Sequence, residues 1–260
     1  MHLIVVAMML GSTLSVSRRM GLRSMSKMTQ IAPPTGAVLP TRDWGGFDNT
    51  RKAQRGQHRL YGGGSGLYNV QGDVERRVYR WLLEVVYGMG LCPWSGSVLK
   101  KPGKGEAPRL EIKSDTDIDI TRKGLKHFGT QFMKYCEELT VKKNGTVLLV
   151  CPTLEDFSDF MAVAEFADEL LEQSGMDEQI QIATFHPDYL FEGEDEETSL
   201  TNQSPYPILH LLRVEDVKEA IESFEAEGRS TDEVWIRNKA FVEKQGDQIR
   251  LILEKILSDI

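Results

Sequence analysis

Residues 144–152 read NGTVLLVCP, and this stretch decides the fold. Asn144-Gly145 is a turn signal. The run from Thr146 to Val150 that follows it is apolar and rich in β-branched residues. Four consecutive apolar side chains need cover on both faces, which is typical of a buried strand in an α/β sheet. We therefore expect residues 146–150 to form a central strand.

Strand and helix patterns alternate on both sides of this run. Short apolar runs predict further strands at 110–113, 180–185 and 208–212. Apolar residues at helical spacing predict helices within 74–86, 125–139, 157–171 and 214–224, and two more within 232–260. This order favours right-handed parallel crossovers. The expected fold class is α/β, a single-domain sandwich whose central, mostly parallel sheet of about four strands is flanked by helices. The direction of the fourth strand stays open.

The N-terminal part has the composition of a targeting segment, not of a core. An apolar run, Leu3 to Leu10, is too short to span a bilayer. A stretch rich in Arg and Ser and free of acids follows it. A signal-like segment followed by a transit-like one predicts targeting by residues 1–42, with the plastid as the expected destination and the mitochondrion as the alternative. Residues 43–69, with their Gly-rich run, then form a flexible linker, and the α/β domain spans 70–260.

Composition limits the partners of the domain. The net charge of the chain is −8. The predicted targeting segment, residues 1–42, contains five basic residues and no acidic ones, so the rest of the chain has a net charge of −8 − 5 = −13. An acidic domain repels phosphate backbones, so we expect no nucleic-acid partner. No apolar stretch is long enough for a membrane span. Three cysteines do not make a disulfide framework and favour a reducing compartment.

The first candidate site is Cys92, in the loop Gly90-Leu91-Cys92-Pro93-Trp94 that follows the first predicted helix. A thiol in a suitable setting acts as a nucleophile. The alternative is a small buried side chain that packs beside Trp94.

The second candidate site follows the strand predicted at 180–185. His186 and Tyr189 come directly after that strand, and ligands in open α/β sheets bind beyond the carboxyl ends of the strands. His186 is therefore a candidate acid, base or metal ligand, and Tyr189 is a candidate substrate-binding residue. The alternative is a histidine that only caps its loop. Cys151 follows the central strand in the same way, although a packing role is favoured for it.

The third candidate site is the polar segment 201–213, which leads into the fourth strand. Asn202, Ser204 and Tyr206 offer hydrogen-bonding groups for a small ligand. His210 lies within the strand as a third candidate catalytic residue after Cys92 and His186. Arg213 could hold a carboxylate or phosphate, or it could form an ion pair with Glu215 or Asp216.

The loops themselves are similar to those of a known family. The segments GLCPW, TFHPDYLFEG and TNQSPYPILHLLR strongly resemble the DUF1415 family over about residues 70 to 245. The resemblance implies a shared site but supplies no reaction. The additional N-terminal segment fits an organelle-targeted member.

Two functions of different classes remain open. In the first, the chain is a small-molecule enzyme in which Cys92, His186 and His210 converge as nucleophile and bases, while the polar loop and Arg213 hold the substrate. In the second, the same loops form a non-catalytic ligand- or metal-binding module. The sequence identifies no cofactor and leaves bound metal open, and a small-molecule ligand is the expected partner in both cases.

Overall fold

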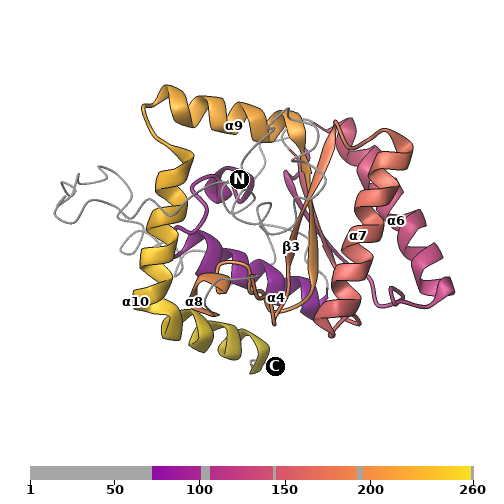
Figure 1. Cartoon of the computed structure of the whole chain (residues 1–260), viewed down its shortest axis with the longest axis horizontal. Coiled ribbons are helices and arrows are strands. Elements are labelled where there is room, and N and C mark those ends of the chain that lie inside the picture. The colour runs from indigo at the N-terminus through magenta and orange to yellow at the C-terminus, as the bar shows by residue number, and fades with distance from the viewer. Residues whose placement is uncertain (1–71, 101–105, 143–144, 192–195, 259–260) are drawn as a thin grey trace, which may run out of the picture.

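A computed structural model describes residues 72–100, 106–142, 145–191 and 196–258. The predicted targeting segment (1–42) and linker (43–69) lie outside these residues, and so does Asn144 of the predicted turn. The described residues form a four-stranded sheet between two layers of helices (Figure 1). This confirms the predicted α/β class.

The elements begin and end close to where the apolar patterns predict them. The strands are β1 (Leu110–Ser114), β2 (Thr146–Val150), β3 (Ile180–Phe185) and β4 (Ile208–Arg213). The helices are α4 (Asp73–Trp81), the π-helix η1 (Leu82–Tyr87), α5 (Ser95–Val98), α6 (Arg122–Thr140), α7 (Phe157–Ser174), α8 (Glu196–Ser199), α9 (Val214–Ala226) and α10 (Thr231–Ser258). Where two C-terminal helices are predicted, the chain forms the single helix α10, which bends along its length (Figure 1).

Local signals set several of these boundaries. Asp156 caps α7, because its carboxylate accepts hydrogen bonds from the backbone N–H groups of Ser158 and Asp159. Gly175 ends the same helix with a φ of 68°, a left-handed conformation that glycine adopts without strain.

The sheet is mixed, and the expectation of a mostly parallel sheet is wrong. Its order is β1-β2-β4-β3; β1 and β2 are parallel, whereas β4 is antiparallel to both of its neighbours. The reason lies in the connection. Parallel neighbours need a long crossover, usually a helix, whereas the chain between β3 and β4 contains only the four-residue helix α8 among its described residues. The chain therefore turns back beside β3.

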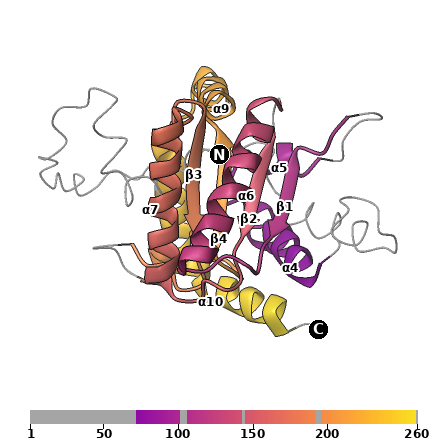
Figure 2. The same ribbon diagram turned by 90° about the vertical axis from the view of Figure 1, so that its right-hand side faces the viewer.

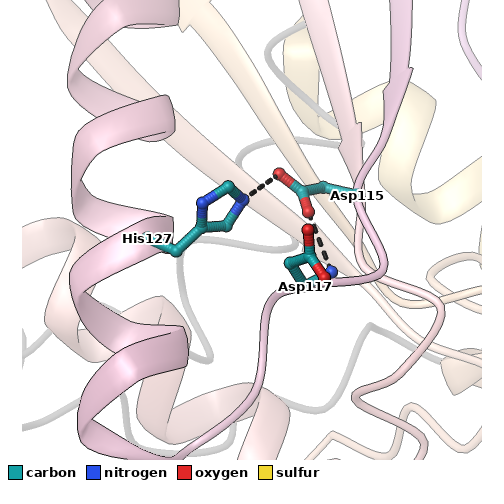
Figure 3. Close-up of side chains that lie close together, drawn as sticks. All are labelled: Asp115, Asp117 and His127. Atoms are coloured by element: carbon teal, nitrogen blue, oxygen red, sulfur yellow. Dashed lines mark hydrogen bonds and ion pairs between the residues drawn. The ribbon is translucent and has the colours of Figure 1, made fainter.

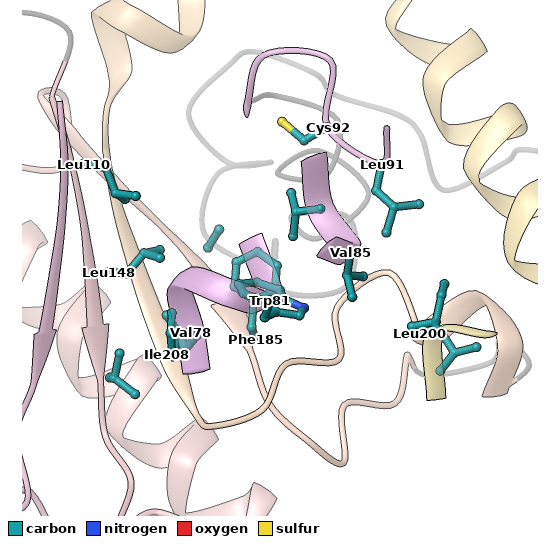
Figure 4. Packing of buried hydrophobic residues seen from close by; sticks show 14 of the residues in the cluster. Val78, Trp81, Val85, Leu91, Cys92, Leu110, Leu148, Phe185, Leu200 and Ile208 are labelled. Carbon is teal, nitrogen blue, oxygen red and sulfur yellow. The ribbon is translucent and has the colours of Figure 1, made fainter. Parts of the chain in front are cut away.

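Each face of the sheet has its own hydrophobic core. Helices α6 and α7 cover one face (Figure 2). Leu149 of β2 and Phe160 of α7 are fully buried there. Helices α4, η1 and α10 cover the other, where Trp81 and Phe185 pack edge to face at 5.2 Å between ring centroids (Figure 4). Alternation along each strand assigns successive side chains to opposite cores. Among the described residues, no helix has the length and apolarity needed to span a membrane.

Candidate functional site

Two of the three candidate loops meet at one edge of the sheet. Strands β1, β2 and β3 run in the same direction, so Ser114, Val150 and Phe185 end at the edge where β4 begins with Ile208. The segment from His186 and the segment leading into β4 are therefore neighbours, as the sequence predicts. The contacts of each polar side chain show what it does there.

His186 is fully buried, and backbone groups occupy both of its ring nitrogens. The backbone N–H of Asp188 donates to Nδ1 at 3.0 Å, so Nε2 carries the hydrogen and donates to the carbonyl oxygen of Leu154 at 3.2 Å. The ring packs against Phe157 and Phe160 of α7. Burial lowers the pKa of His186, which favours the neutral ring. In this structure His186 joins the loop after β3 to the loop after β2.

The polar side chains around it also have protein partners. Asn202 is fully buried; its amide donates to the carbonyl of Thr184 at 3.3 Å. The Ser204 hydroxyl donates to the carbonyl of Tyr206 at 2.6 Å, and the Tyr206 hydroxyl accepts from Arg77 at 2.9 Å. Tyr189 is likewise buried: its hydroxyl accepts from Thr184 at 3.4 Å, and burial raises its pKa. These contacts fix the loops around the ends of β3 and β4.

Arg213 lies at the far end of β4, away from these loops. It pairs with Ile180, the first residue of β3, whereas the loops surround the last residue of that strand. Its guanidinium forms ion pairs with Glu215 and Asp216, each at 2.9 Å. The structure therefore places Arg213 in the ion pairs that the sequence offers as the alternative to ligand binding.

A pocket lies on the face of the sheet that α4 and η1 cover. Its sheet wall includes Leu148, Phe185 and His210, and its opposite wall includes Trp81 of α4 and Cys92 of the loop after η1. The space open to the centre of a water-sized sphere is about 50 Å³, several times what one water molecule needs. The walls are almost wholly apolar, and no charged side chain of the described residues lines them.

Cys92 and His210, far apart in the sequence, therefore share one pocket, whereas His186 lies on the opposite face of the sheet. Phe185 points into the pocket, and the next residue, His186, points towards α7. The structure brings together two of the three predicted catalytic residues and separates the third from them.

The ring of His210 is oriented by Thr146, the first residue of β2. The Thr146 hydroxyl lies 2.6 Å from Nε2 of His210 and 2.9 Å from the carbonyl oxygen of Leu211. Burial lowers the pKa of His210 well below the usual value, so the ring is neutral at physiological pH. Sequence reasoning treats Thr146 only as the start of a strand. Thr146 is nevertheless the only polar residue of that strand, and it lies diagonally across from His210, which pairs with Leu148.

The loop that carries Cys92 is held by α10. Arg237 donates to the carbonyl oxygens of Gly90 (2.6 Å) and Met89 (3.2 Å), and Asn238 donates to that of Leu91 (2.7 Å). Cys92 is 7% exposed and stands at the edge of the core cluster drawn in Figure 4. The other two thiols are different: Cys136 and Cys151 are fully buried in the opposite core, and burial raises the pKa of each.

One cluster of possible metal ligands lies beyond the end of β1. Asp115, Asp117 and His127 offer ligand atoms within 4.8 Å of one another (Figure 3). Asp115 already pairs with His127 Nε2 at 2.8 Å and accepts from the backbone N–H of Asp117 at 3.0 Å. An ion pair and a turn therefore account for this arrangement.

The comparison with protein families agrees with the loop motifs. The profile of the family described as "Protein of unknown function (DUF1415)" matches residues 73–250, well over half of the chain, and the match includes the pocket and its supporting loops. No curated protein and no solved structure matches the chain. The chain therefore belongs to the DUF1415 family.

Proposed function

We propose that the chain is a small-molecule enzyme whose active site is the pocket shared by Cys92 and His210. One observation carries the proposal: a thiol and a neutral imidazole, from segments far apart in the chain, line the same apolar pocket. A base and a sulfur nucleophile in a site with little water are a common catalytic combination. A packing role alone needs neither side chain at this position.

The loops beyond the sheet then support the pocket and do not hold the substrate. His186 donates its backbone N–H to the carbonyl of Asn202 at 3.3 Å, and the Asn202 side chain binds the carbonyl of Thr184. These bonds fix the chain on both sides of Phe185, which lines the pocket. The polar residues of the loops thus act on the site through the position of β3.

The non-catalytic alternative uses the same pocket. A binding module would release its ligand unchanged, whereas an enzyme would convert it. A metal centre built from Cys92, His186 and His210 lacks support, because both ring nitrogens of His186 already bind backbone groups.

Selective labelling tests the proposal. Iodoacetamide should modify Cys92 before Cys136 and Cys151, because only Cys92 lines the pocket. Activity is measured by adding the protein to a metabolite mixture and following the conversion of small molecules by NMR. The unlabelled protein should convert one or more of them, and the labelled protein should not. Cys92→Ser and His210→Gln should lose this activity too, while the matched control Cys136→Ala should keep it. Conversion that survives in both pocket variants would overturn the proposal.

We also propose that residues 1–42 direct the protein to the plastid. The support is the composition of this segment: an apolar run followed by a stretch rich in Arg and Ser and free of acids. A fluorescent protein fused behind residues 1–42 should enter plastids in a cell with complex plastids. Fluorescence in mitochondria or in the cytosol would contradict it.

A further inference from the structure

The hydrogen bonds of Thr146 fix which nitrogen of His210 carries the hydrogen. The carbonyl oxygen of Leu211 can only accept, so the single hydroxyl hydrogen of Thr146 goes to it. Thr146 must then accept from His210, and Nε2 of His210 is the donor. In a neutral imidazole, a hydrogen on Nε2 leaves a lone pair on Nδ1. Nδ1 is therefore a hydrogen-bond acceptor.

This acceptor is unused within the described part of the protein. Nδ1 of His210 has no hydrogen-bond partner there. Since His210 lines the pocket, Nδ1 is the ring nitrogen that remains for a ligand in the pocket. The Cys92 thiol does not take it up, because no hydrogen bond joins Cys92 to His210 among the described residues.

The other polar groups of the residues that line the pocket offer no exposed strong donor, because the indole N–H of Trp81, although it has no hydrogen-bond partner, is fully buried. The Ser95 hydroxyl donates to the carbonyl oxygen of Cys92 at 2.7 Å, and the Thr146 hydrogen is committed to Leu211. The thiol of Cys92 is a weak donor. Among the described residues, no charged side chain lines the wall to balance an anion.

We infer that the pocket selects a small, uncharged and mostly apolar molecule that carries one N–H or O–H group and donates it to Nδ1 of His210. The inference rests on the proposed function and gives the substrate class of the same site. It excludes carboxylates and phosphates, because no cationic side chain of the described residues lines the apolar pocket to balance their charge. It also means that His210 accepts the hydrogen bond of the ligand, since no hydrogen bond joins the Cys92 thiol to the ring among the described residues.

Two nearly isosteric probes test this class. Pyrrole donates an N–H, while furan has an oxygen acceptor in its place; furan-2-carboxylate adds the anion. Binding is followed by the ring resonances of ¹⁵N-labelled histidine, which also report the tautomer of His210. Pyrrole should bind roughly threefold to tenfold more tightly than furan, the range of one neutral hydrogen bond, and the carboxylate should not bind.

Thr146→Val and Thr146→Ser are the matched variants. The valine removes the acceptor that holds the hydrogen on Nε2, so the preference for pyrrole should disappear; the serine keeps the hydroxyl and should retain it. A hydrogen on Nδ1 in the free wild-type protein, or tight binding of the carboxylate, would overturn the inference.

The outcomes also separate this inference from the proposed function. If pyrrole and furan bind equally well and both slow the alkylation of Cys92, the ligand class is wrong and the pocket remains the site. If no probe shifts His210 or protects Cys92, the ligand class and the proposed site both fail.

Discussion

Two histidines of this chain carry their hydrogen on the same ring nitrogen and yet differ in what they can do. In His186, Nδ1 accepts from the backbone N–H of Asp188 and Nε2 donates to Leu154, so both ring nitrogens already have hydrogen-bond partners. In His210, which lines the pocket, Nδ1 remains for a ligand. Both residues look equally reactive in the sequence. Their partners, Leu154 and Thr146, lie 32 and 64 residues away, which is why sequence alone does not separate a histidine that joins two loops from one that can act as a base.

Removing His186 should cost stability without touching the pocket. His186→Leu leaves the carbonyl of Leu154 and the N–H of Asp188 without their partner, so the free energy of unfolding should fall by about 1–3 kcal/mol. His186→Gln can still donate to Leu154 and should lose less. Urea unfolding measures both, with His127→Leu, at a partly exposed site, as the control. A His186→Leu protein as stable as the wild type would show that these bonds contribute nothing.

His186 should also make the fold sensitive to acid. Its pKa is lowered by burial in the folded protein, so the unfolded state binds the proton more readily. The stability that the neutral ring contributes is therefore present above the unfolded pKa of about 6.5 and is lost as the pH falls towards the folded pKa. Between pH 7 and 5, the wild type should lose more unfolding free energy than His186→Gln. Equal losses in the two proteins would contradict this.

Among the elements, β2 is predicted from sequence alone and the role of α10 is not. The apolar run 146–150 is long enough to demand cover on both faces, and all five residues are buried. Helix α10 does have a pattern in its sequence. Val234, Asn238 and Val242 are spaced four residues apart and form one buried stripe. A buried Asn in an apolar stripe needs a partner, and its partner is the loop of Cys92. The sequence does not show which loop that is.

Breaking this contact should loosen the Cys92 loop. Asn238→Leu keeps the volume but leaves the carbonyl of Leu91 unpaired. Losing one buried hydrogen bond should raise the population of the open loop, and with it the rate of Cys92 alkylation, by roughly tenfold. The exposed Lys244→Leu is the control. An unchanged rate in Asn238→Leu would show that α10 does not position the loop.

The central place of β2 has a direct test. Leu149→Asp would place an unpaired carboxylate in the core between the sheet and α7, at a cost of several kcal/mol. We expect this variant not to fold into a soluble protein, while Val141→Asp, at a site 84% exposed, folds normally. A soluble Leu149→Asp protein with a cooperative thermal transition would show that the run is not central.

At the scale of the whole molecule, the sequence predicts the elements better than their arrangement. The number of strands follows from the apolar runs, but the direction of β4 depends on whether its connection crosses the sheet, and that connection has no clear pattern. The site depends on the same geometry. Being at one edge of the sheet does not mean sharing a face, because alternation sends Phe185 and His186 to opposite cores.

This separation places the proposed active site on one face of the sheet and the buried loop histidine on the other. The face covered by α4, η1 and α10 contains the pocket with Cys92 and His210. The face covered by α6 and α7 contains His186, Cys136 and Cys151, all of them fully buried. We expect small molecules to bind only on the face of the sheet that carries Cys92 and His210.

Crystals soaked with a library of small uncharged fragments test that claim most directly, because the electron density shows where each fragment binds. The account predicts fragments in the pocket between Cys92 and His210, with a donor group of the fragment within hydrogen-bond distance of Nδ1 of His210. Fragments that leave this pocket empty and instead gather beside His186, Asn202 and Ser204 would contradict it.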